Sequence, residues 1–117
     1  AGTDDVELIP GLEVLDEDFI VDKPRFSAFI GTNFELVLRQ LGATRLIVCG
    51  VTTSMCVEST VRDASQRDYD VFVVEDACAE LDATRHAAAL TAMGFGFARI
   101  VDSEEALSML ANAPPRA

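Results

Sequence analysis

The chain is poor in several residue types, and each shortage argues against a class of protein. Nine residues are basic against 20 acidic ones, giving a formal net charge of -11, which argues against binding to nucleic-acid phosphates or anionic lipid. No apolar run approaches the ~20 residues that a membrane-spanning helix needs. The opening Ala-Gly-Thr-Asp-Asp lacks the basic and apolar parts of a signal peptide. We therefore expect a cytoplasmic protein with no nucleic-acid and no membrane partner.

Cysteine and histidine are also scarce. The three cysteines, Cys49, Cys56 and Cys78, are odd in number and form no C-x-x-C pair, which favours a reducing compartment over a disulfide framework. The single histidine, His86, cannot build a usual zinc site. No H-E-x-x-H, G-x-G-x-x-G or G-x-x-x-x-G-K-[ST] motif is present. Nothing in the chain therefore requires a metal or an organic cofactor.

What the chain does have is the composition of one globular domain. Hydrophobic residues make up 50% of its 117 positions and charged residues 25%. At this length a chain can bury roughly two-thirds of its unfolded surface, which leaves room for one core only. We assign residues 1–111 to one domain and residues 112–117, which include Pro114-Pro115, to a tail.

Apolar spacing and capping residues predict strands that alternate with helices. Asn33 and Ser103 are expected to cap helices, Gly42 to end one, and Gly94-Phe95-Gly96 to form a turn. The expected strands are 19–22, 45–50, 71–74 and 97–101, and the expected helices are 34–41, 55–67, 82–93 and 103–111. This alternation predicts a layered α/β fold with a parallel sheet. The unbroken apolar run at 45–50 is typical of a central strand that is buried on both faces.

In such a sheet, ligands bind beyond the carboxyl ends of the strands, so the residues that follow each strand are candidates for chemistry. Lys23 follows the first expected strand and is the only lysine in the chain. A lysine is a compact positive charge that can stabilise a nucleophile or a developing anion. The alternative is a solvated lysine at the end of a strand.

Cys56 is the second candidate. A turn rich in Thr and Ser places it in the first turn of a helix, where free N–H groups and the helix dipole stabilise a thiolate. The same N–H groups can hold the oxyanion of a tetrahedral intermediate. The alternative is a small buried apolar residue. We expect Cys49 to be a core residue, leave Cys78 open, and place His86 away from the carboxyl edge in a structural role.

Two strings of residues resemble those of the isochorismatase-like cysteine hydrolases. They are Lys23-Pro24-Arg25-Phe26-Ser27-Ala28-Phe29 and Gly50-Val51-Thr52-Thr53-Ser54-Met55-Cys56-Val57-Glu58-Ser59-Thr60, the latter followed by Arg62-Asp63. Within that superfamily they look most like the ureidoacrylate, biuret and N-carbamoyl amide hydrolases. These enzymes act on amide and ureido C–N bonds.

The resemblance implies a Rossmann-like three-layer αβα fold and a catalytic Asp-Lys-Cys triad, with Lys23 and Cys56 in the lysine and nucleophile positions. It also implies a cis peptide bond between Val51 and Thr52 beside the substrate pocket. An oxyanion hole formed by the backbone N–H groups of Met55 and Cys56 is implied as well. The substrate is then a small amide or ureido compound, and a homo-oligomer is expected by analogy.

The aspartate of the triad has no counterpart here, because the D-x-Q stretch that carries it in the family is absent. Asp4, Asp5, Asp76 and Asp102 do not match it, and Asp76 is interpreted as a structural or capping residue. We therefore expect the chain to be the C-terminal portion of a hydrolase domain that lacks a central strand. The N-terminal portion of the same enzyme is then its expected partner, as another chain. The alternatives are an isochorismatase-type vinyl-ether hydrolase, which needs no thiol at this position, and a non-catalytic fragment.

Overall fold

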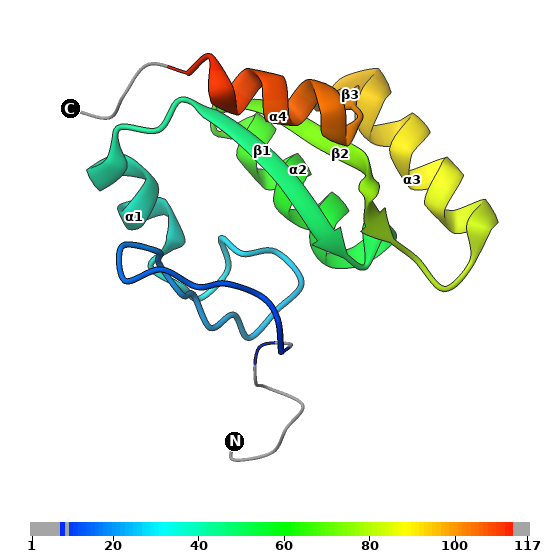
Figure 1. The fold of residues 1–117 in the computed structure, drawn as a ribbon. Coiled ribbons are helices and arrows are strands. Elements are labelled where there is room, and N and C mark those ends of the chain that lie inside the picture. The colour runs from blue at the N-terminus through cyan, green and yellow to red at the C-terminus, as the bar shows by residue number, and fades with distance from the viewer. Residues whose placement is uncertain (1–7, 9, 114–117) are drawn as a thin grey trace.

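A three-stranded parallel sheet with helices on both faces forms the body of the protein (Figure 1). The computed structural model describes residue 8 and residues 10–113. Its elements in chain order are α1 (Phe34–Leu41), β1 (Arg45–Val51), the π-helix η2 (Thr53–Val57), α2 (Glu58–Gln66), β2 (Asp70–Ala79), α3 (Ala83–Gly96), β3 (Arg99–Val101) and α4 (Ser103–Ala111). The predicted α/β class with a parallel sheet is confirmed.

Two apolar clusters, one on each face, hold the helices to the sheet. On one face, α2 and α3 pack on β2 through residues that are almost fully buried: Val57, Val61, Ala64, Val71, Val73, Ala89 and Met93. On the other face, α4 packs on β2 and β3 through Phe72, Val74, Val101 and Ala106. Successive residues from Val71 to Val74 therefore pack alternately into the two clusters. Because both faces of this strand are buried, its sequence is a continuous apolar run.

The strand order is β1-β2-β3, so β1 lies at an edge of the sheet and not at its centre. Leu46 and Val48 are partly buried against the α2–α3 cluster, whereas Cys49 is exposed and Val51 is 66% exposed. The predictions of a central strand and of a buried Cys49 are thus wrong for the part of the chain that the structure describes. On the face that α4 covers, Ile47 of β1 packs against the α4 cluster, whereas Cys49 is exposed.

The expected strand at 19–22 is absent. These residues are irregular, and Phe19 and Ile20 are 54% and 65% exposed. A strand needs a neighbour for its backbone hydrogen bonds, and this segment pairs with none of the described strands. An irregular segment then leads to α1, which lies to one side of the sheet (Figure 1).

One helix end agrees with the prediction and two differ from it. Gly42 ends α1 in the left-handed conformation, as predicted, with a φ of 67°. Gly94-Phe95-Gly96 is not a turn, because α3 continues to Gly96. A Cβ on Gly94 would lie 3.0 Å from Cγ1 of Ile100, so this glycine serves the close packing of α3 on β3. The N-cap of α4 is Asp102, whose side chain accepts from the N–H of Glu105, and Ser103 is the first residue of that helix.

None of the helices in the described residues is both long enough and apolar enough to span a bilayer.

Candidate active site

Cys56 lies on a π-helix that begins just beyond the carboxyl end of β1. The strand ends at Val51, and the peptide bond between Val51 and Thr52 is cis, as the resemblance implies. The chain then forms η2, and α2 continues directly from it. The expected single helix 55–67 is therefore a π-helical turn followed by an α-helix, with Cys56 half-buried in the turn.

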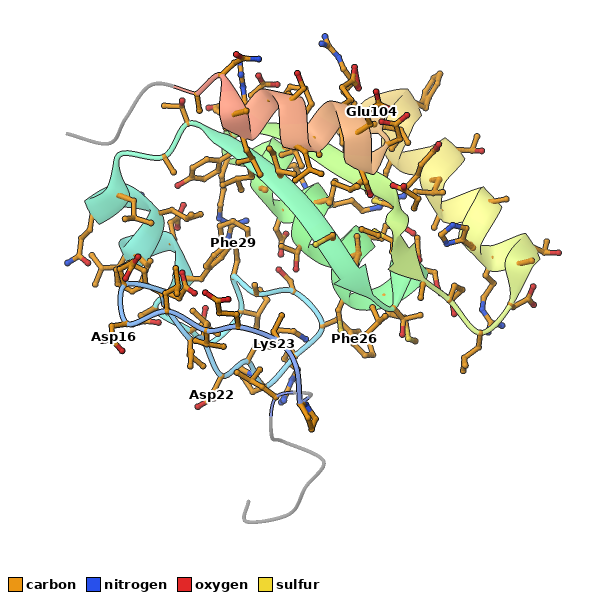
Figure 2. All side chains as sticks on the ribbon, viewed as in Figure 1. Asp16, Asp22, Lys23, Phe26, Phe29 and Glu104 are labelled. Atoms are coloured by element: carbon orange, nitrogen blue, oxygen red, sulfur yellow. The ribbon has the colours of Figure 1, made fainter. Side chains whose placement is uncertain are left out.

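Lys23 reaches Cys56 from a distant part of the sequence. Its Nζ lies 3.1 Å from the Sγ of Cys56 and 3.2 Å from the carbonyl oxygen of Arg25. Figure 2 labels Lys23 and Phe26 on the loop that passes beside the carboxyl end of β1. The amine is solvent-exposed and the thiol half-buried. The structure therefore brings the two predicted side chains within hydrogen-bonding distance.

The loop that carries Lys23 is tied to the helix that follows Cys56. The backbone N–H of Ala28 donates to the Oγ1 of Thr60 at 3.0 Å. Ser27 is buried and accepts from the N–H of Phe29 at 3.2 Å. Because Thr60 lies one helical turn after Cys56, the same rigid element holds both the thiol and the anchor of the lysine loop.

The start of η2 is held from the other side by His86. The Nδ1 of His86 and the Oγ1 of Thr53 are 2.9 Å apart, and Thr53 is fully buried. His86 lies in the first turn of α3, so its ring reaches the carboxyl edge of the sheet. The prediction that it lies away from this edge is wrong, because the long β2 strand and its connection bring the beginning of α3 back onto η2.

The backbone donors near Cys56 differ from the expected set. The N–H of Met55 donates to the carbonyl of Thr52 at 3.0 Å, and the N–H of Val57 donates to the same oxygen at 3.3 Å. The oxyanion role of the N–H of Met55 stays a prediction, in which that N–H would turn from the Thr52 carbonyl to the substrate. An oxyanion role for the N–H of Cys56 remains a prediction.

Among the described residues, no aspartate joins Lys23 and Cys56 as the third member of a triad. Asp76, within β2, accepts from both the N–H and the hydroxyl of Ser103, each at 2.8 Å, and so caps α4, in line with the structural role expected of it. Asp102 caps the same helix. Asp4 and Asp5 lie outside the described residues. Within the described part of the chain, Lys23 makes no ion pair, and no group of three His, Cys, Asp or Glu side chains could hold a metal ion.

The other two thiols lie in different surroundings from Cys56. Cys78 pairs with Gly50 across the β1–β2 ladder and is half-buried. Burial raises the pKa of Cys78 above its ordinary value, and the nearby Cys49 and Asp76 add to this effect against the backbone N–H of Gly50. Cys78 therefore remains a neutral thiol at neutral pH.

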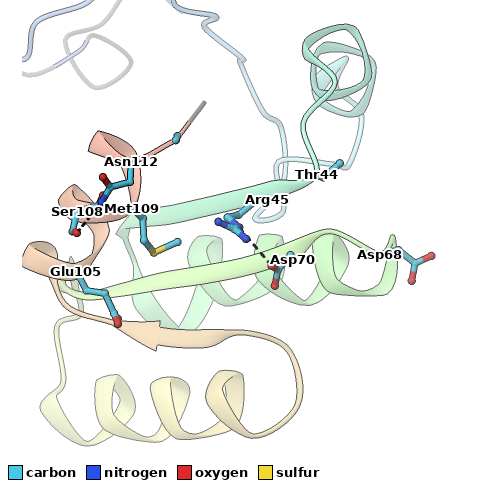
Figure 3. A pocket seen from close by; sticks show the side chains of 9 residues that line it. Thr44, Arg45, Asp68, Asp70, Glu105, Ser108, Met109 and Asn112 are labelled. Atoms are coloured by element: carbon cyan, nitrogen blue, oxygen red, sulfur yellow. Dashed lines mark hydrogen bonds and ion pairs between the residues drawn. The ribbon is translucent and has the colours of Figure 1, made fainter. Parts of the chain in front are cut away.

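An open hollow of about 850 Å³ lies at the opposite end of the sheet (Figure 3). It runs between the beginning of β1 and the last turn of α4, and its lining includes Arg45, which pairs with Asp70 at 3.6 Å. Neither Lys23 nor Cys56 lines it. Because ligands in parallel α/β sheets bind beyond the carboxyl ends of the strands, this hollow is not the candidate active site.

The Isochorismatase domain family matches residues 1–105. The chain belongs to this family. Nicotinamidase 3 from Arabidopsis thaliana is 37% identical over 106 residues, which cover 89% of this chain and 54% of the relative. Ureidoacrylate amidohydrolase RutB from Methylobacterium radiotolerans is 35% identical over 117 residues, covering 97% of this chain and 45% of the relative.

Solved structures of the isochorismatase family share the fold. A cysteine hydrolase from Pseudomonas syringae pv. phaseolicola superposes with a TM-score of 0.90 at 32% identity, covering 94% of this chain and 57% of that one. This chain thus spans about half the length of the curated relatives named above.

The sequence motifs did not identify every residue that builds the site. The strings that contain Lys23 and Cys56 identified both residues, and the second string also includes Thr60. Glu80, which accepts a hydrogen bond from the N–H of Ser54 in η2, was not identified by either motif. It lies outside both strings, in a polar stretch between a strand and a helix where a carboxylate is ordinarily solvated.

Proposed function

We propose that this chain carries the lysine and the nucleophile of a cysteine amidohydrolase that cleaves a C–N bond of a small amide or ureido compound. The observation that carries the proposal is the 3.1 Å contact between the Nζ of Lys23 and the Sγ of Cys56. Relatives named as a nicotinamidase and a ureidoacrylate amidohydrolase support the substrate class.

The chemistry requires a base, a nucleophile and stabilisation of charge. A base takes the proton of the Cys56 thiol, and the thiolate attacks the carbonyl carbon of the substrate. The ammonium of Lys23 stabilises the thiolate and then the negative charge of the tetrahedral intermediate, together with the N–H of Cys56. The C–N bond then breaks, and ammonia or an amine leaves with the proton that the base held. Water hydrolyses the thioester, releasing the acid and restoring the thiol.

We further propose that the base is an aspartate from the N-terminal portion of the same enzyme. Asp76, within β2, and Asp102, directly after β3, are both occupied as helix caps. The chain spans about half the length of its curated relatives, which leaves room for such a portion. Its docking place is the free edge of β1, where Cys49 and Val51 are exposed although the strand is an apolar run. An apolar strand added in parallel there covers the open face and satisfies the unpaired backbone groups.

The test is release of ammonia from a panel containing a ureido acid, biuret, an N-carbamoyl amino acid and nicotinamide. The chain is assayed alone and after reconstitution with the N-terminal portion, with Cys49→Ser as the thiol control for Cys56→Ser. We expect turnover only in the reconstituted enzyme, unchanged by Cys49→Ser and abolished by Cys56→Ser. Turnover of a vinyl ether that survives Cys56→Ser would contradict the proposal.

A further inference from the structure

Glu80 is a buried carboxylate next to the turn that carries Cys56. It follows β2 directly and precedes Asp82, the N-cap of α3. Its side chain is only 2% exposed. A buried charge is costly unless hydrogen bonds or an opposite charge compensate for it, so the partners of this carboxylate show what it does.

Both oxygens of Glu80 are occupied. Its Oε2 accepts from the backbone N–H of Ser54 at 3.0 Å and also from the hydroxyl of Ser54. Its Oε1 accepts from the N–H of Leu81 at 3.0 Å and lies 3.7 Å from the Nη2 of Arg85. The hydrogen bond from the Ser54 hydroxyl lowers the pKa of Glu80 against the opposing effect of burial, so the group is ionised at neutral pH.

Ser54 is the second residue of η2, two positions before Cys56. Thr53, its neighbour, is held by His86, and the carbonyl of Thr52 accepts from Met55 and Val57. These contacts do not hold Ser54, which lies between Thr53 and the end of the turn that carries the thiol. The two hydrogen bonds to Glu80 fix Ser54 instead. The Sγ of Cys56 must stay within 3.1 Å of Lys23, and small displacements of reacting groups are costly to catalysis.

We propose that Glu80 is a positioning residue for the Cys56 nucleophile and acts through its two hydrogen bonds to Ser54. This inference rests on the proposed function, because it assumes that Cys56 is the nucleophile. Glu80 itself is not assigned contact with substrate. Its effect is to fix the orientation of η2, and so the direction in which the Cys56 thiol points toward Lys23 and the substrate carbonyl.

The experiment compares Glu80→Ala, Glu80→Gln, Ser54→Ala and the double variant Glu80→Ala/Ser54→Ala in the reconstituted enzyme. Glu104→Gln, at the exposed beginning of α4 (Figure 2), is the control for loss of a carboxylate. Three quantities are measured: kcat, KM, and the rate at which iodoacetamide labels Cys56. The labelling rate needs no substrate, and Glu80→Gln and Ser54→Ala are informative if Glu80→Ala does not fold.

We expect Glu80→Ala to lower kcat and the Cys56 labelling rate by about 10- to 100-fold with little change in KM. Glu80→Gln should retain activity within a few-fold, because its amide oxygen still accepts from Ser54. The double variant should be little worse than Glu80→Ala, because Glu80→Ala already removes the hydroxyl contact that Ser54→Ala removes.

Two results would overturn the inference while leaving the proposed function intact. One is a Glu80→Ala variant that loses stability but keeps the wild-type kcat and Cys56 labelling rate, which would make Glu80 purely structural. The other is a double variant whose losses multiply, which would mean that Glu80 does not act through Ser54. If Cys56 in the wild type labels no faster than Cys49 and no C–N bond is cleaved, the proposed function fails and this inference fails with it.

Discussion

At the scale of single residues, the function proposed here depends on a lysine and a cysteine that are far apart in the sequence and close together in the structure. Lys23 comes from an irregular loop and Cys56 from a π-helix, yet their Nζ and Sγ atoms are 3.1 Å apart. The bond from Ala28 to Thr60 makes this approach reproducible, because it ties the loop to the helix that bears the thiol. Cys49 and Cys78 have no such cationic partner among the described residues.

Replacing Lys23 by Met tests its role in charge stabilisation. Lys23→Met keeps the length of the side chain and removes its charge, so we expect kcat in the reconstituted enzyme to fall by about 10²- to 10³-fold. The matched control is Arg39→Met, which removes an exposed charge from α1. Steady-state kinetics with the best substrate of the panel measures both. Equal kcat values for Lys23→Met and the wild type would mean that the amine has no part in the reaction.

Sequence patterns identified Lys23 and Cys56 but not the residues that support them. The pair lies within two motifs of specific composition, so local sequence was sufficient. Glu80 and His86 act through contacts that form only when the connection after β2 folds back on η2. Residue spacing in the sequence does not predict these contacts. The hydrogen bond from the N–H of Met55 to the carbonyl of Thr52 was likewise not predicted, because it depends on the π-helical turn.

At the scale of secondary-structure elements, the sheet and its flanking helices hold the site through two separate apolar clusters. The α2–α3 cluster includes Val57, the residue after Cys56, and Met93, which is fully buried. Packing of α3 on β2 thus supports the position of η2. The apolar runs predicted strands at 45–50 and 71–74, but not the continuation of β2 to Ala79, because Glu75 and Asp76 interrupt the apolar pattern. The segment 19–22 is not a strand, because pairing depends on a neighbour that periodicity does not show.

Met93 should contribute strongly to the stability of this cluster. We expect Met93→Ala to lower the free energy of unfolding by about 2–5 kcal/mol, because it removes a buried side chain and leaves a cavity. Phe95→Ala, on the same helix but 95% exposed, should change it little. Urea unfolding followed by circular dichroism measures both. Similar losses for the two variants would place the core elsewhere.

The pH dependence of stability should carry a contribution from Glu80. Hydrogen bonds from Ser54 lower its pKa from the ordinary value of 4.5 in the folded state. A carboxyl whose pKa is lower in the folded state stabilises the fold above its unfolded pKa. That stabilisation disappears as the pH falls through the folded value. We therefore expect the urea midpoint of the wild type to fall as the pH is lowered from about 5 to 3.

In Glu80→Gln this acid-induced fall should be smaller, because the variant has no proton to take up at that position. Glu104→Gln, which changes an exposed carboxylate, is the control and should behave like the wild type. A Glu80→Gln variant with the same acid profile as the wild type would show that the carboxylate is not preferentially stabilised by folding.

At the scale of the whole molecule, β1 has a neighbouring strand on one side only among the described residues. β1 is apolar in sequence, yet it lies at the edge with Cys49 exposed and Val51 66% exposed. A strand of this composition is typical of the middle of a parallel sheet. The apolar sequence of β1 therefore predicts a strand on each side of it, and the described residues supply only one. This agrees with a chain that spans about half the length of its curated relatives.

A charge on the open face of β1 tests whether the N-terminal portion docks there. Cys49 is exposed, so Cys49→Arg should leave the isolated chain folded. It should weaken association with the N-terminal portion at least tenfold in Kd, because docking would bury an unpaired charge. Ala87→Arg, exposed on α3 on the other side of the sheet, is the control. Equal binding of both variants, measured by titration calorimetry, would place the docking surface elsewhere.

The pairing of Lys23 with Cys56 as the reactive centre is tested most directly by labelling the three cysteines with limiting iodoacetamide. The rate at each position is followed by fragment-ion mass spectrometry in the wild type and in Lys23→Met. We expect Cys56 to be labelled first, ahead of the exposed Cys49 and the neutral thiol of Cys78, and we expect this lead to disappear in Lys23→Met. Labelling of Cys49 ahead of Cys56, or an unchanged lead in Lys23→Met, would contradict it.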